Sequence, residues 1–186
     1  GGAPGGLRRA VGERPGGSVF PEASFAAAQI GRPMAPALRA VLEGKDAALA
    51  AWARDRGVVP GALYAKSAQL LGDVGGPEAV PALVRKLSYQ DADAGIATYV
   101  RVFAAESLGR LRARDAARPL ADLVAREKDA DVRDRYCDAL ARIGDPSIIP
   151  LLRAAAAAAP GWDLREGPLV ALSRLGGDAE GKAVEE

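Results

Sequence analysis

The chain has 186 residues, of which 49% are hydrophobic, and this is enough to bury one sizeable core. Its 25 basic and 24 acidic side chains leave a formal net charge of +1, so charge favours no nucleic-acid partner, which usually needs a clustered basic surface. Histidine is absent and Cys137 is the single cysteine, which excludes a histidine-based triad, an intramolecular disulfide and a cysteine-based zinc site. We therefore predict no catalytic residue, no metal site and no cofactor. No run of 18 apolar residues occurs, so we expect no membrane span.

The N-terminal third is irregular in pattern. Residues 1–19 are rich in Gly and Pro and predict a flexible leader. Residues 20–57 predict N-terminal helices that form an irregular or capping repeat. Their pairing is ambiguous, because the helix expected over 35–43 resembles the second helix of a later hairpin and also makes a plausible hairpin with the helix expected over 46–56. Asp46 is the expected cap of that last helix.

From residue 58 to residue 186 the pattern becomes regular and predicts helical hairpins. The expected helices cover residues 61–73, 77–87, 97–111, 115–127, 132–143 and 146–158, followed by a last helix that starts near Asp163 or at Pro168. Asp115, Asp131 and Asp145 are the expected caps of three of them, and Asp163 is a candidate cap of the last helix. A longer loop is expected over residues 88–95, which lengthens the first of these hairpins.

One unit recurs along this region at a spacing of 32 residues. Its matching positions are Val100-Arg101, Val132-Arg133 and Leu164-Arg165, then Leu108, Leu140 and Leu172, then Leu111, Ile143 and Leu175. Self-similarity at this period is typical of stacked helical hairpins that each bury their apolar face on the next. We predict an all-α fold, a right-handed α-solenoid of about four hairpins. Such a solenoid offers a surface to partners and not a catalytic pocket.

The repeated unit resembles a HEAT repeat. The residues that carry the resemblance are Asp131-Val132-Arg133, Ala139-Leu140, Ile143-Gly144-Asp145 and Ile149-Pro150-Leu151-Leu152, repeated as Ala68, Leu71-Gly72-Asp73 and Val80-Pro81-Ala82-Leu83. The unit is most similar to the short bacterial type named after phycobilin lyases. The resemblance covers residues 60–176 and, more weakly, 20–57. It departs from the pattern at Arg112, which stands where the turn has Gly, and at Pro168.

A narrower resemblance concerns the N-terminal half. Phe25-Ala26-Ala27-Ala28, Gly44-Lys45-Asp46-Ala47-Ala48-Leu49 and Ala65-Lys66-Ser67-Ala68-Gln69-Leu70-Leu71-Gly72 are similar to HEAT-like tails of some bacterial multihaem cytochromes. The Cys-x-x-Cys-His motif of those proteins is absent, so haem ligation does not carry over. The resemblance implies a periplasmic or extracellular electron-transfer setting. Apart from it, the sequence leaves the location of the protein unknown.

The most regular polar feature is a column of arginines, Arg101, Arg133 and Arg165. Asp131 and Asp163 each stand two residues before an arginine at the same spacing. The column is either a basic surface for an anionic partner or a structural ladder. We favour the ladder, in which each arginine bonds an Asp or a backbone carbonyl of the adjacent repeat.

The second helix of each hairpin carries the polar residues that we expect to face a partner. The candidate partner-binding residues are Arg85, Lys86, Arg118, Asp122, Arg126 and Arg153. Trp162, in an expected loop, is a candidate aromatic anchor. Trp52 and Cys137 are expected to lie in the core.

We therefore expect a non-catalytic scaffold for protein–protein interaction, a subunit or accessory module of a larger assembly. Two alternatives come from the resemblances. The first is an accessory module of a periplasmic or extracellular multihaem cytochrome complex. The second is a bilin-lyase-like enzyme, since bilin lyases are also built as HEAT-like solenoids.

Overall fold

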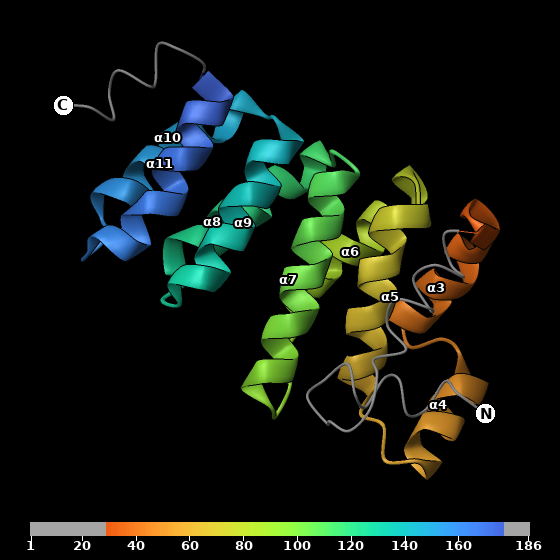
Figure 1. Ribbon diagram of the computed structural model, residues 1–186. Coiled ribbons are helices and arrows are strands. Elements are labelled where there is room, and N and C mark those ends of the chain that lie inside the picture. Colours follow the sequence, from red (N-terminus) through yellow and green to blue (C-terminus); the bar gives the residue numbers. More distant parts are fainter. Residues whose placement is uncertain (1–28, 177–186) are drawn as a thin grey trace. The chain divides into compact units, whose positions relative to one another are not determined.

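The computed structural model describes residues 29–176, and within them the only regular elements are α-helices and short 3₁₀ helices (Figure 1). The predicted leader, residues 1–19, lies outside the described residues, as do residues 20–28 at the start of the expected N-terminal helices. The elements, with 3₁₀ helices written η, are η1 (Arg32–Met34), α3 (Ala35–Leu42), α4 (Ala47–Asp55), α5 (Pro60–Val74), η2 (Pro77–Ala79), α6 (Val80–Lys86), α7 (Ala94–Arg110), η3 (Arg114–Ala116), α8 (Ala117–Arg126), α9 (Ala130–Ile143), η4 (Pro146–Ile148), α10 (Ile149–Ala157) and α11 (Trp162–Gly176). The predicted all-α class is confirmed.

The chain divides into two compact units, Gly1–Ser107 and Leu108–Glu186, with the boundary inside α7. This boundary differs from the change of pattern at residue 58, and the division of the sequence into an irregular and a regular region stays a prediction.

The second helix of each hairpin starts with a 3₁₀ turn, and this detail resolves the ambiguous pairing. The turns η2, η3 and η4 lead directly into α6, α8 and α10. The turn η1 leads into α3 in the same way, with a proline at its start as in η2 and η4, where the missing N–H and the fixed φ of proline are tolerated. The helix α3 is therefore a second helix, and α4 is an additional helix between it and α5.

The core of the first unit joins helices that are distant in sequence. Leu42, Leu71 and Leu83 are completely buried, and α3 lies beside α5 (Figure 1). The Ser107 hydroxyl donates a 2.7 Å hydrogen bond to the Ala68 carbonyl, which requires α7 to approach α5 closely.

The added helix α4 is held by a small apolar cluster of its own. Its buried members are Ala53, Val58, Ala62 and Leu63, with Val41, Leu49 and Trp52 packed against them. Trp52 is half-buried there, and the Arg56 guanidinium lies 4.7 Å from the centre of its ring. Trp52 was predicted to lie in the core, and it packs against this cluster but is only partly buried.

In the second unit α9 contacts both α8 and α11, and α10 contacts α11. Tyr136, Leu140 and Leu152 are fully buried between these helices. Pro168 is buried inside α11, which runs without a break from Trp162 to Gly176. The alternative in which the helix begins at Pro168 is therefore wrong, because residues 162–167 before it are already helical.

The predicted caps are confirmed in two cases. The Asp46 carboxylate accepts from the Leu49 N–H at 2.9 Å and the Asp145 carboxylate from the Ser147 N–H at 2.9 Å. The other three predictions are wrong. Asp129 caps α9 and accepts from the Val132 N–H at 3.1 Å, so Asp131 lies two residues after the cap, in the first turn of the helix.

Asp115 and Asp163 lie inside the first turns of η3 and α11 and not before them. Acidic residues are favourable in a first turn as well as at a cap, because both positions face the positive end of the helix dipole. Sequence pattern alone therefore does not separate the two positions.

Arg112 holds the only positive φ of a non-glycine residue among the described residues, +50°. Gly144, at the equivalent position of the next hairpin, has φ +71°. We expect Arg112→Gly to raise the free energy of unfolding by up to about 1 kcal/mol. The left-handed conformation costs a residue with a side chain about 1–2 kcal/mol, and glycine avoids this strain but loses more conformational entropy on folding. Urea denaturation measures the change. The reverse substitution, Gly144→Arg, is the matched control and should destabilise; equal effects from both would contradict the argument.

Candidate functional site: a cationic groove between α3 and α6

A groove in the first unit gathers charged and aromatic side chains from three segments. Its volume is about 430 Å³, and it is lined by Leu42, Glu43, Lys45, Ala82, Arg85, Lys86 and Tyr89. The segments are the end of α3 with the turn that follows it, the last turn of α6, and the loop after α6. We call it the α3–α6 groove.

The turn after α3 brings two of these side chains together. Gly44 has φ +72°, a left-handed conformation in which glycine is preferred. The N–H groups of Gly44 and Lys45 return to the carbonyls of Val41 and Ala40 at 2.9 and 2.8 Å, which closes the helix end. A Cβ atom on Gly44 would lie 3.1 Å from the Tyr64 hydroxyl, so the turn packs tightly against α5.

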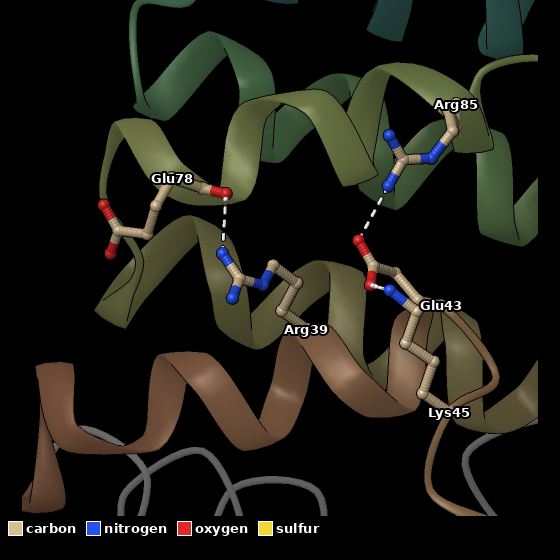
Figure 2. A network of polar contacts seen from close by, with 5 residues as sticks. All are labelled: Arg39, Glu43, Lys45, Glu78 and Arg85. Atoms are coloured by element: carbon tan, nitrogen blue, oxygen red, sulfur yellow. Dashed lines mark hydrogen bonds and ion pairs between the residues drawn. The ribbon is translucent and has the colours of Figure 1, made fainter.

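Glu43 is the centre of the charge network in the groove. Its carboxylate contacts Lys45 at 2.6 Å and Arg85 at 2.7 Å, and Figure 2 shows both cations pointing at it from different segments. The Glu43 side chain is 16% exposed, against 71% for Lys45 and 62% for Arg85. The hydrogen bond from Lys45, together with the charges of Lys45, Arg85 and Arg39, holds the pKa of Glu43 below its ordinary value despite burial. The carboxylate is therefore ionised and fixes the two cations at the rim.

A second contact between the same elements lies further along α3. Arg39 donates to the Glu78 carbonyl at 3.4 Å (Figure 2). Glu78 belongs to η2 and Arg85 to α6. The contacts Arg39–Glu78 and Glu43–Arg85 therefore hold α3 against both η2 and α6. This pair of second helices forms the two walls of the groove.

Lys86 lies on two aromatic rings at one end of the groove. Its ammonium nitrogen is 3.7 Å from the Tyr64 ring centre and 5.0 Å from that of Tyr89, and the two rings meet edge to face at 5.7 Å. Burial first, and then the charge of Arg85, lower the pKa of Lys86. The ring faces attract the cation and partly offset its loss of water.

The loop after α6 is held in place by its own hydrogen bonds. The Tyr89 hydroxyl donates to Asp91 at 2.7 Å, and Arg101 donates to the Tyr89 carbonyl at 3.1 Å. Asp93 accepts from the Gly95 and Ile96 N–H groups at 2.8 and 3.2 Å. This cap explains why α7 begins at Ala94, three residues before the predicted start.

The repeated hairpins match a known family of repeats. The family model for HEAT repeats matches two overlapping stretches, residues 60–135 and 97–173, which together cover more than half of the chain. The chain belongs to the HEAT-repeat family. HEAT repeats generally mediate protein–protein interaction. No curated protein matches the chain.

The candidate partner-binding residues are divided between the two units. Arg85 and Lys86 line the α3–α6 groove. The others, which belong to the second unit, are Arg118, Asp122, Arg126, Arg153 and Trp162. Arg118 and Asp122 pair with each other at 3.2 Å on the surface of α8, while Arg126 and Arg153 are exposed.

Trp162 is 63% exposed, as an anchor would be. It is the first residue of α11 and not part of a loop, so its predicted placement is wrong, because the helix begins directly after Pro160-Gly161.

Sequence reasoning missed Glu43, Lys45, Tyr64 and Tyr89. The available signal was the Leu42-Glu43-Gly44-Lys45 stretch, which is typical of a charged helix end, together with the unusually long loop after α6. Neither signal names a site until α3 is recognised as a second HEAT helix that neighbours α6.

The arginines of the predicted structural ladder have three different environments. Arg133 is 3% exposed and donates to the Ala155 carbonyl at 3.0 Å. Arg101 donates to the Tyr89 carbonyl and, at 3.0 Å, to the Thr98 hydroxyl. Arg165 is exposed. Asp131 and Asp163 are exposed as well. Arg101 and Arg133 therefore donate to backbone carbonyls of neighbouring segments and not to these carboxylates.

Residues 29–176 hold no group of three or more His, Cys, Asp or Glu side chains that could hold a metal ion. No helix among them is long and apolar enough to cross a membrane.

Cys137 is 2% exposed in α9, as predicted for a core residue. Burial is the main cause that raises the pKa of its thiol to about 12, so almost no thiolate exists at pH 8. We expect no reaction with a thiol reagent such as DTNB in the native state and one thiol per chain in urea. Ala125→Cys, exposed on α8, is the positive control. Rapid native labelling of Cys137 would contradict the structure.

Asp134 in α9 has a buried oxygen, Oδ1, without a hydrogen-bond partner among the described residues. Burial first, and then the charges of Glu166, Asp131 and Asp138, raise its pKa. The folded state then binds more protons than the unfolded state, so this carboxyl group lowers stability as the pH rises through its folded pKa. We expect Asp134→Asn to be more stable than the wild type at pH 7, with the difference lost at about pH 3, below the ordinary pKa of Asp. Thermal melting across this pH range tests it, and a pH-independent difference would contradict it.

Proposed function

We propose that this HEAT-repeat protein is a non-catalytic scaffold, a subunit or accessory module of a larger assembly, and that a partner protein docks in the α3–α6 groove. The observation that carries the proposal is the arrangement around Glu43, where one partly buried carboxylate holds Lys45 and Arg85 at an exposed rim beside Lys86. Cations fixed in this way recognise a partner at a lower entropic cost than freely moving side chains.

The general role of HEAT repeats supports the proposal. The groove lies between two second helices, the position at which the sequence places its candidate contact residues. Its side chains also form no nucleophile–base pair of the kind that covalent catalysis needs, since Lys86 rests on aromatic rings and Glu43 is held by two cations.

The test is native purification of the tagged full chain from its source cells, with mass spectrometry of the proteins that co-purify. We expect a stoichiometric partner that is retained by the wild type and by Arg142→Gln, a variant of an exposed arginine of α9 that is not among the candidate partner-binding residues. The double variant Lys45→Gln, Arg85→Gln should lose this partner. A stoichiometric partner that both variants retain, or a clean monomer in every case, would overturn the groove as the docking site.

Two narrower functions expected from the resemblances each have a readout of their own. A Soret absorbance band in the co-purified complex would support an accessory module of a multihaem cytochrome complex. Bilin binding by the isolated chain would support a bilin-lyase-like enzyme in place of the scaffold. The phycobilin-lyase type of the repeat is likewise a proposal from resemblance.

A further inference from the structure

An apolar pocket adjoins the α3–α6 groove in the same unit. Its volume is about 420 Å³, and it is lined by Val41, Gly44, Asp46, Leu49, Ala50, Ala53, Arg54, Gly57, Val58, Val59, Pro60, Leu63 and Tyr64. We call it the α4 pocket, since α4 supplies one of its walls. The two cavities meet at the turn of residues 43–46, where Gly44 lines the pocket while Glu43 and Lys45 line the groove.

The additional helix α4 creates this pocket. The alternation of long first helices with 3₁₀-led second helices is complete without α4, which stands between α3 and α5. Its cluster with Val58 and Leu63 supplies an apolar floor, and Val59 is 47% exposed beside it. The pocket is therefore open to solvent and apolar, a combination typical of sites that accept an apolar group of a partner.

Tyr64 joins the two cavities physically. Its ring carries the Lys86 ammonium group at 3.7 Å, while its side chain also lines the α4 pocket and contacts Gly44. An apolar cavity and a cluster of cations thus share one aromatic side chain. A ligand that fills both must combine an apolar group with negative charge close to it.

We propose that the α4 pocket and the α3–α6 groove together bind an acidic peptide segment of the partner protein, with one apolar side chain in the pocket and carboxylates on Lys45, Arg85 and Lys86. The inference rests on the proposed function and names the chemistry of the partner. Three cations face one carboxylate in the groove, so the charge balance favours an anionic ligand. Arginine has five N–H donors and lysine three, so Arg85 and Lys45 can bind Glu43 and a further carboxylate together.

The probe is a fluorescein-labelled synthetic peptide of about ten residues, with one Leu between runs of Asp and Glu. Its binding to the full chain is followed by fluorescence anisotropy at low salt. We expect saturable binding that weakens steeply as salt screens the charges. A second peptide with Ser in place of Leu should bind at least about tenfold more weakly, because it has no group for the pocket.

Two pairs of variants map the two halves of the site. Lys45→Gln with Arg85→Gln should weaken binding of the Leu peptide by about tenfold or more, while Arg142→Gln, at an exposed position of α9, leaves it unchanged. Ala50→Glu places a negative charge in the α4 pocket and should weaken binding similarly. Ala48→Glu is the matched control, because Ala48 is exposed on the same helix and does not line the pocket. All five substituted positions are exposed, so melting temperatures should stay near that of the wild type.

Three results would overturn the inference. Equal affinity for the Leu and Ser peptides would reduce the site to a general anion site. Loss of affinity in Ala48→Glu equal to that in Ala50→Glu would remove the pocket from the site. A dimer seen by sedimentation, and dissociated by the same groove variants, would assign the groove to a second copy of the chain. If the peptides fail while the native partner is still lost on Lys45→Gln, Arg85→Gln, the docking function stands and only the acidic class of partner fails.

Discussion

Arg133→Ala is expected to lower the free energy of unfolding by about 3 kcal/mol. The Arg133 side chain is 3% exposed in α9, and its guanidinium donates to the Ala155 carbonyl in the last turn of α10. The substitution removes a charge-assisted hydrogen bond to a helix end and leaves a cavity in the second unit. Urea denaturation followed by circular dichroism measures the loss.

Arg165→Ala is the matched control, because Arg165 stands at the same position of the repeat but is exposed on α11. Its effect should stay within about 0.5 kcal/mol. Arg133→Met separates the two contributions, since methionine keeps most of the buried stem and loses only the hydrogen bond. Equal effects of Arg133→Ala and Arg165→Ala would show that the repeated arginine, and not its burial, sets the stability.

Gly167→Ala is expected to destabilise the second unit by about 2 kcal/mol. Gly167 lies where α11 packs on α9, and a Cβ atom there would collide with the Asp134 carboxylate and come 3.3 Å from the Asp134 Cα. The backbone of α9 is part of this contact, so rotation of the Asp134 side chain relieves only some of the collision. Thermal and urea denaturation give the change.

The double variant Gly167→Ala, Asp134→Ala tests the cause of this loss. Removing the carboxylate should recover part of the stability, and the shortfall from additivity measures the contact between the two residues. Gly57→Ala is not a suitable control, because Gly57 has a positive φ and its strain is of backbone origin. Gly95→Ala is the better control, because Gly95 has no positive φ. The nearest atom to its Cβ would be the Asp93 Oδ1 at 3.1 Å, which is a side-chain atom and not backbone. Strict additivity of Gly167→Ala and Asp134→Ala would contradict the proposed collision.

The placement of α4 has the largest consequence for function. A HEAT array without it has no wall for the α4 pocket, and the α3–α6 groove stays a charged surface without an apolar neighbour. The extra helix is small, and its only buried side chain is that of Ala53. Its helical pattern is visible in the sequence, but its role as a pocket wall depends on the position of α3 and α5.

Local signals in the sequence determined much of the fold. The 32-residue recurrence predicted the HEAT hairpins, and the expected ranges agree with the observed helices to within three residues at nearly every end, because apolar periodicity and turn residues act over a few neighbouring positions. Asp46 and Asp145 cap their helices for the same reason. The left-handed Arg112 was also foreseen as a departure from the repeat.

Only the tertiary structure decided which distant residues meet. Glu43 and Arg85 are 42 residues apart and Arg133 and Ala155 are 22 apart, and no local pattern pairs them. The repeat predicted one environment for Arg101, Arg133 and Arg165, but burial differs at each because different segments cover them. Side-chain contacts of this kind follow from the packing of whole helices, so the identity of α3 as a second helix, and with it the α3–α6 groove, became visible only in three dimensions.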